Sequence, residues 1–381
     1  MRRCERVETS LAFLLSLAVV LGGCASSAAR GSGAEEGDSK VEPRTAPVVV
    51  ACRGELWSFE LDYATGALTK RSVVSGGSGA SYLALSRDRR ILYVLDRDPP
   101  SRVDWFSVSA DGFSLERQGG ALTEGRSPPH LSLHPSGRWI LVAHHGSGHV
   151  SVLPVEADGS VGDAVFVEQA VDRQAHMALS DPSGRFVFVP ATGPNRVVQY
   201  RFDAQTGRLS PNDPPFVEGG GPDAQPRHLA FHPSGRFVYV INEKDSTLTS
   251  YRYDAPSGRL LDPESISTVP SEYLGDNGPA HVVVSPSGRF VYGSNRGHDS
   301  IVIYAVDPTT GRLRLVGHET AGGLIKFPRS FTLSPDGTRL LVANENSDSL
   351  LVFVVGEDGR IDPMGPPVPS GAKPSFVQVL R

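Results

Sequence analysis

A hairpin-like stretch recurs along the chain at intervals close to 50 residues. It reads PRHLAFHPSGRFVYVINE at 226–243, and related copies begin at 81, 128, 174, 279 and 327. With Arg89, Gly137, Gly184, Gly235, Gly288 and Gly337 taken as equivalent positions, the spacings are 48, 47, 51, 53 and 49 residues. Each copy places two short apolar runs around turn residues, which is typical of paired strands. A repeat of this length, built from strands alone, predicts a β-propeller in which every repeat forms one four-stranded blade.

Two partial copies at the ends of the chain complete the count of blades. Residues 48–68 match the later strands of a repeat, and residues 373–379 match its first strand. The 336 residues from 46 to 381 also divide into seven units of 48. The sequence therefore predicts an all-β, seven-bladed propeller over 46–381, closed by N- and C-terminal strands in one shared blade. Closure of this kind leaves no exposed sheet edge.

The first 45 residues do not follow the repeat. Basic residues precede a short apolar run at 11–20, which is typical of an export signal rather than of a membrane span. The motif LGGC, ending at Cys24, resembles the lipobox of bacterial lipoproteins; the alternative is a plain secretory signal with a chance cysteine. The resemblance implies a signal peptide over 1–23, acylation of Cys24 and, because Ala25 follows, a lipid anchor in the outer membrane facing the periplasm. Residues 24–45 are small, polar and charged, which predicts a flexible tether.

Composition excludes several classes of function. The formal charge of −5 gives no basic surface for nucleic acid. Once the signal is removed, only Cys24 and Cys52 remain, so no disulfide framework is expected. The chain has no nucleophile elbow, no phosphate-binding glycine loop and no zinc-ligand spacing, and we expect a monomer without cofactor or metal.

Positions that are shared by the repeats are interpreted as features of the fold. The arginine after the turn glycine, present at 138, 185, 236 and 289, is expected to face solvent. Asn242, Asn295 and Asn344 share a column seven residues after the turn. We interpret these asparagines as strand-end caps, with a metal-binding ring as the alternative.

Two columns, eight residues before and eight after the turn, differ between the repeats. The earlier column holds Ser81, Pro129, His176, Arg227, Ala280 and Arg329, and the later one Arg97, His145, Thr192, Glu243, Arg296 and Glu345. In an antiparallel hairpin the start of the first strand lies beside the end of the second, so both columns are expected at one mouth of the central channel. Buried charges need partners, so these groups either form salt bridges between blades or bind an anion.

Three longer stretches, at 221–247, 294–313 and 326–353, resemble the seven-bladed propeller lactonases, which include bacterial 6-phosphogluconolactonases and fungal carboxymuconate cyclases. The resemblance covers roughly residues 47–381 and implies a lactone hydrolase of carbohydrate metabolism. It assigns catalytic roles, by position, to His176, Arg227, Glu243 and Arg296. We assign substrate binding to His228, Arg329, Lys326 and Asn295. The chain departs from the family at Gln174, where histidine is usual, and at His281, where an acidic residue is usual.

Chemistry suggests roles for the candidate groups. Opening a lactone requires attack of water on the ester carbonyl and stabilisation of an oxyanion. Either Glu243 or His176 is a candidate general base, and Arg227 and Arg296 are suited to hold the oxyanion or a substrate anion. The same steps in reverse close a lactone. Two other functions remain open: a non-catalytic periplasmic binding or scaffold lipoprotein, and a metal-dependent lactonase that uses the asparagine column with Glu243.

Overall fold

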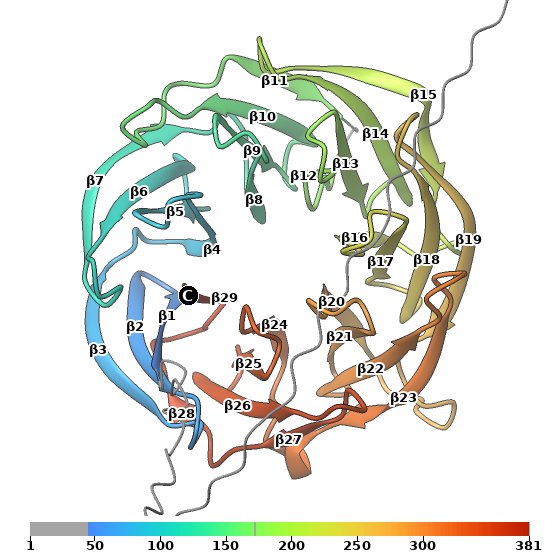
Figure 1. Cartoon of the computed structure of the whole chain (residues 1–381). Helices are drawn as coiled ribbons and strands as arrows, with labels where there is room; N and C mark the ends of the chain where they lie inside the picture. Colours follow the sequence, from blue (N-terminus) through green and yellow to red (C-terminus); the bar gives the residue numbers. More distant parts are fainter. Residues whose placement is uncertain (1–44, 171–172, 381) are drawn as a thin grey trace, which may run out of the picture. The chain divides into compact units, whose positions relative to one another are not determined.

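The computed structural model describes residues 45–170 and 173–380; the predicted signal peptide, Cys24 and the tether up to residue 44 lie outside these described residues. Seven antiparallel sheets stand as blades around a common centre (Figure 1). The predicted all-β, seven-bladed propeller is confirmed. Within the described ranges, no helix is both long and apolar enough to cross a membrane.

Each blade runs outward from an innermost strand to a rim strand, as Figure 1 shows. Blade 1 contains β4 (Ala80–Leu85), β5 (Ile91–Asp96), β6 (Arg102–Val108) and β7 (Leu115–Leu122); blade 2 contains β8 (His130–Leu133), β9 (Trp139–Ala143), β10 (His149–Pro154) and β11 (Phe166–Gln169). Blade 3 contains β12 (Leu179–Ser180), β13 (Phe186–Ala191), β14 (Arg196–Asp203) and β15 (Arg208–Glu218); blade 4 contains β16 (Pro226–Phe231), β17 (Phe237–Asn242), β18 (Thr247–Asp254) and β19 (Arg259–Ser267).

Blade 5 contains β20 (Gly278–Val284), β21 (Phe290–Arg296), β22 (Ser300–Val306) and β23 (Leu313–Glu319). A 3-10 turn, η1 (Ala321–Gly323), leads into blade 6, which contains β24 (Pro328–Leu333), β25 (Arg339–Asn344) and β26 (Ser349–Val355). Two short strands, β27 (Ile361–Pro363) and β28 (Val368–Pro369), both pair with β26 and share the outer position of this blade.

Blade 7 joins the two ends of the propeller. Its order is β29 (Phe376–Val379), β1 (Thr45–Cys52), β2 (Glu55–Asp62) and β3 (Leu68–Ser75). The innermost strand β29 pairs antiparallel with β1, with Val48 opposite Val379 and Ala51 opposite Phe376. The sequence prediction of one blade shared by strands from both ends is therefore confirmed.

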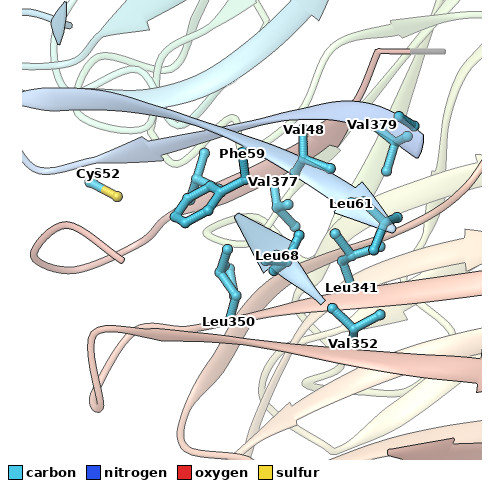
Figure 2. Close-up of a cluster of buried hydrophobic side chains, with 13 residues drawn as sticks. Val48, Cys52, Phe59, Leu61, Leu68, Leu341, Leu350, Val352, Val377 and Val379 are labelled. Carbon is cyan, nitrogen blue, oxygen red and sulfur yellow. The ribbon is translucent and has the colours of Figure 1, made fainter. Parts of the chain in front are cut away.

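The core lies between neighbouring blades, because each sheet packs both of its faces against other sheets. Figure 2 shows one such layer, where Val48, Phe59 and Val377 of blade 7 pack against Leu341 and Leu350 of blade 6. All five side chains are buried. Burial on both faces explains why the middle strands are nearly continuous apolar runs, and it ties the closing strands to the preceding blade.

The turn that recurs in the repeats links blades as well as strands. Gly235 has a φ of +67°, a conformation that glycine adopts without strain. The arginines that follow this turn are exposed, and three of them also reach the next blade: Arg138 donates to the carbonyl of Ala204, Arg185 to that of Ala255 at 2.8 Å and Arg236 to that of Pro308 at 2.7 Å. The turn column therefore serves the scaffold at the end of the strands opposite to the candidate site.

Candidate active site

A β-bulge interrupts the innermost strand of several blades at the column selected from the sequence. In blade 4, Pro226 pairs with Asn242 and His228 pairs with Ile241, so the register passes over Arg227. The same irregularity occurs at Ser81 in β4, at Ala280 and His281 in β20 and at Arg329 in β24. A bulge re-aims the side chain of the extra residue. Here it lets strands that are otherwise apolar present polar groups at one end of the channel.

Glu243 connects the two arginines that the sequence analysis selected. Its Oε1 accepts a hydrogen bond from Arg296 Nη2, and its Oε2 lies 3.6 Å from Arg227 Nε. Arg227 and Glu243 belong to blade 4 and Arg296 to blade 5. The Glu243 side chain keeps 31% of its surface exposed, whereas that of Arg227 keeps 3%. The carboxylate thus sits at the mouth, and the Arg227 guanidinium lies beneath it.

The two guanidinium groups are held by main-chain atoms as well. Arg296 Nε donates to the carbonyl of Gly278 at 2.8 Å, and the group lies over the Phe327 ring, 5.3 Å from its centroid. Arg227 Nη1 donates to the carbonyl of Ala280 in blade 5 and lies 3.3 Å from Nε2 of His228. Both cations are therefore fixed in position before any ligand arrives, which is the condition for electrostatic stabilisation of a transition state.

Burial and the charges of Glu243, Arg227 and Arg296 shift the pKa values of Glu243 and Arg227. Burial raises the pKa of Glu243, but Arg227 and Arg296 together outweigh burial, and the pKa is lowered from 4.5. Burial and the neighbouring charge of Arg296 lower the pKa of Arg227, although a guanidinium remains protonated at neutral pH. Glu243 is consequently a carboxylate above pH 5 and a weak base, and its main effect is to orient and partly neutralise the two arginines.

His176 lies beside the arginine pair, as expected from the sequence. Its ring centroid is 5.1 Å from that of His228 and 5.8 Å from that of His145. Burial, followed by the charge of Arg227, lowers the pKa of His176 well below 6.5, so the imidazole is neutral at pH 7. Its Nδ1 is buried and has no hydrogen-bond partner among the described residues. This nitrogen is therefore not engaged by any other described residue.

A layer of rings lies next to the arginine pair, and the sequence analysis missed most of it. Its members occupy the position directly after the bulge column and include Tyr82, His130, His228, His281 and Phe376. His228 and His281 are joined through their Nδ1 atoms at 2.9 Å. The signal was present in the sequence, because three of six repeats carry histidine in this column; the sequence analysis named His228 and His281 but not His130.

Two cavities that share Ser81, Arg329 and Ser375 lie beside these groups, and of His176, Arg227, Glu243 and Arg296 only Arg227 lines one of them. The inner one is lined by Tyr82, Arg227, His228, His281, Arg329 and residues from blades 2 and 7. The outer one has a volume of about 400 Å³ and includes Arg97, Arg329 and Glu345. A larger cleft of about 1050 Å³ lies between blades 1 and 2 at the opposite ends of the strands, near Arg138, but it contains none of the candidate residues. We place the candidate site by its ionisable side chains and not by the size of the cavity.

The other proposed substrate-binding residues divide into two groups. His228 and Arg329 line the inner cavity. Lys326 lines a separate surface pocket with Leu324 and Asp348 and is absent from the lining of both of these cavities. Asn295 is fully buried; its amide donates to Thr268 O at 2.7 Å and accepts from Asn277 Nδ2 at 3.0 Å. Lys326 therefore lies in a different pocket, and the side chain of Asn295 is already hydrogen-bonded to other protein groups.

The asparagine column braces the mouth of the channel. Asn242 donates to the hydroxyls of Thr247 and Thr249, and Asn344 accepts from the backbone N–H of Lys326 at 3.0 Å. These contacts fit the interpretation as strand-end caps. In the described part of the chain, no three or more His, Cys, Asp or Glu side chains are grouped so that they could hold a metal ion.

Comparison with known proteins agrees with the fold. Residues 51–379 match the family model described as "Lactonase, 7-bladed beta-propeller". The 6-phosphogluconolactonase of Bacillus subtilis is 28% identical over 312 residues, 78% of this chain and 86% of that protein. The 6-phosphogluconolactonase of Pectobacterium carotovorum is 32% identical over 321 residues, covering 83% and 93%. The solved structure of a periplasmic gluconolactonase of Pseudomonas aeruginosa is similar with a TM-score of 0.81 and 30% identity, covering 88% and 98%.

Fold and cluster together define a β-propeller with a charged, imidazole-rich site at one mouth of its channel. The lactonase family model matches residues 51–379, which is nearly the whole described chain. This protein belongs to the seven-bladed β-propeller lactonase family.

Proposed function

We propose that the protein hydrolyses the lactone of an aldonic acid at the cluster formed by His176, Arg227, Glu243 and Arg296. The observation that carries the proposal is the bridge from Glu243 to both arginines beside a neutral imidazole with an unpaired nitrogen. A carbonyl oxygen that becomes negative finds two fixed cations there. The names of the similar proteins, which are lactonases acting on gluconolactones, support this substrate class.

The proposed reaction assigns one task to each group. His176 accepts a proton from water as the water oxygen bonds to the lactone carbonyl carbon, and Arg227 and Arg296 stabilise the oxyanion that forms. The ring C–O bond then breaks, and the departing alkoxide takes the proton back from the imidazolium. Of the two bases that the sequence analysis left open, we assign this role to His176, because both carboxylate oxygens of Glu243 are engaged by the arginines whereas Nδ1 of His176 has no protein partner among the described residues. Glu243 holds the arginines in place.

The place of action proposed here is the periplasm, with the chain attached to the outer membrane through acylated Cys24. The basic start, the short apolar run and the LGGC motif support export and lipidation. The similarity to a periplasmic gluconolactonase supports the same compartment. Replacing Cys24 with alanine should abolish labelling by radioactive palmitate and release the protein from the membrane fraction, whereas unchanged membrane association would contradict the lipid anchor.

The test of activity uses the full chain in detergent with a panel of sugar and aliphatic lactones. We expect faster opening of an aldonolactone than in buffer, at least a hundredfold loss in Arg296→Ala, and less than a twofold change in Arg312→Ala, an exposed arginine of blade 5 that pairs with Glu264. Rates equal to buffer for every lactone would replace the proposal with a non-catalytic binding protein.

A further inference from the structure

Two adjacent histidines follow β9, and their side chains have different environments. The ring of His144 is fully buried, and its Nε2 lies 3.0 Å from the hydroxyl oxygen of Ser151. The side chain of His145 is half-buried, and within the described ranges its ring makes no hydrogen bond. His144 therefore belongs to the scaffold, whereas the fold gives the imidazole of His145 no hydrogen-bonding task. The reaction proposed above uses neither of them.

The backbone fixes His145 at the mouth of the channel, on the border between blades 2 and 3. Its N–H donates to the carbonyl of Ser127 at 3.3 Å, and its carbonyl accepts from the N–H of Gln174 at 2.8 Å. Gln174 is two residues before His176, so this bond brings the start of blade 3 against His145. The rings of His145 and His176 meet edge to face, with their centroids 5.8 Å apart and their planes at 81°. His145 is thus a partly exposed neighbour of the proposed base.

A positive charge is costly on His176. This residue is only 6% exposed, so water solvates an imidazolium there poorly. The guanidinium groups of Arg227, Arg329 and Arg296 also repel such a charge, and together with burial they lower the pKa of His176. A base that keeps the proton taken from water has to bear this charge, and a base that passes a proton onward does not.

His145 is better placed to hold the charge. Its side chain keeps contact with solvent, and a carboxylate acts on it. Burial lowers the pKa of His145, and Arg227 and Arg97 add to this effect, but Glu243 opposes them. The principal charges that act on His176, in contrast, all lower its pKa. Of the two imidazoles in contact, the one nearer to solvent is therefore the more stable site for a proton.

We propose that His145 is the proton-relay partner of His176 during lactone opening. As the water oxygen bonds to the carbonyl carbon, one ring nitrogen of His176 takes the proton from water, and the other releases its own proton to His145. When the ring C–O bond breaks, the alkoxide takes a proton by the reverse route, and both imidazoles are neutral again. One water molecule, or the tightening that accompanies substrate binding, brings the rings within hydrogen-bond reach. This inference rests on the proposed function and adds a residue to it.

Chemical rescue tests the relay with the full chain in detergent and an aldonolactone as substrate. His145→Gln keeps a polar side chain that cannot take up a proton. We expect kcat to fall at least tenfold while KM stays within twofold, and added imidazole to restore part of the lost rate, above the rate of imidazole alone. The parent and Arg312→Ala should show no such gain. An unchanged kcat, or a loss that imidazole does not restore, would overturn the relay.

The neighbouring histidine provides a matched control. His144→Gln disturbs the buried contact with Ser151, so we expect a lower Tm in thermal unfolding and no gain in rate from imidazole. His145→Gln should leave Tm close to that of the parent, because its ring makes no hydrogen bond within the described ranges. Equal gains from imidazole in the two variants would mean that the added base acts without a vacated relay position, and the proposal would fail.

The dependence of kcat on pH gives a second readout. A relay partner must be neutral to take up a proton, so kcat of the parent falls as the pH drops through the pKa of His145. The titratable and charged groups that act on this ring are His176, Glu243, Arg227 and Arg97. In His145→Gln the residual rate depends on His176, whose pKa lies well below 6.5, and we expect the acid limb to move to lower pH. The same acid limb in both proteins would contradict the relay.

The relay and the lactonase function fail in different ways. Rates equal to buffer in the parent for every lactone would refute the function and the relay with it. An active parent that His145→Gln matches at every pH would refute the relay alone, and hydrolysis with His176 as the base would stand.

Discussion

The Nδ1 atoms of His228 and His281 lie 2.9 Å apart across the boundary between blades 4 and 5. Arg227 can only donate, so its contact with His228 Nε2 leaves the proton of His228 on Nδ1, and Nδ1 of His281 must accept it. Burial and the charge of Arg227 lower the pKa of both imidazoles, to about 3 for His281, so both are neutral. A buried chain of hydrogen bonds therefore runs from the Arg227 guanidinium into blade 5.

Removing the last hydrogen bond of this series, between His228 and His281, should lower the free energy of unfolding. In His281→Leu the Nδ1–H of His228 is buried without an acceptor, and we expect a loss of about 1–3 kcal/mol in the free energy of unfolding, measured by urea denaturation. In His281→Asn the amide oxygen replaces Nδ1 as acceptor, and most of the loss should be recovered. Equal losses in the two variants would show that the ring of His281 matters for packing and not for its nitrogen.

Removing the carboxylate between the arginines should affect both stability and activity. Glu243→Gln leaves Arg227 and Arg296 facing each other with no negative charge between them, and we expect a loss of about 1–3 kcal/mol, limited by the partial exposure of Glu243. Lactone hydrolysis should fall at least a hundredfold. The matched change Asp262→Asn breaks an exposed pair with Arg252, and less than about 1 kcal/mol should be lost. A comparable effect of the two changes would argue against the assigned role.

Acid should destabilise the propeller below pH 6.5. Burial lowers the pKa of the buried histidines, to about 3 for His130. Between pH 3 and pH 6.5, His130 is therefore protonated in the unfolded chain but not in the folded chain. Each such histidine contributes stability that is complete above pH 6.5 and is lost, by up to about 1.4 kcal/mol per pH unit, as the pH falls. His130→Phe keeps a ring against Tyr82, and unfolding curves from pH 7 to 4 should show a shallower decline. An unchanged slope would contradict this.

Packing between blades should outweigh exposed apolar contacts. Leu350→Ala opens a cavity in the fully buried layer between blades 6 and 7, and we expect a loss of about 2–5 kcal/mol in urea denaturation. Leu274 is 94% exposed, and its replacement with alanine should change stability by less than about 0.5 kcal/mol. A small effect at Leu350 would mean that neighbouring blades close the cavity by shifting toward each other.

The sequence was sufficient for the number of blades and for their closure, because a propeller repeats one local pattern and each repeat reports its own strands. It was also sufficient to predict that Arg227, Glu243 and Arg296 lie close together, because the two columns that hold them meet at the same end of the inner strands. Their catalytic role stays a prediction. The β-bulge at Arg227 was not predicted, because register depends on the partner strand.

Other members of the site depend on tertiary contacts that spacing alone does not define. Lys326 is three residues from Arg329 in the sequence, yet it precedes β24 and lines a different pocket. Asn295 is next to Arg296, but alternation along β21 turns it into the protein, where its amide is satisfied. His130 was overlooked because an imidazole in an inner strand is compatible with an ordinary core position.

The pairing of β29 with β1 has a consequence for biosynthesis. Since the innermost strand of the shared blade comes from residues 376–379, the ring cannot lock until these residues have left the ribosome. The other six blades are synthesised before the strand that closes the ring. A chain exported as proposed above would reach the translocation machinery before blade 7 has closed, and this late closure would help to keep the chain unfolded for transport.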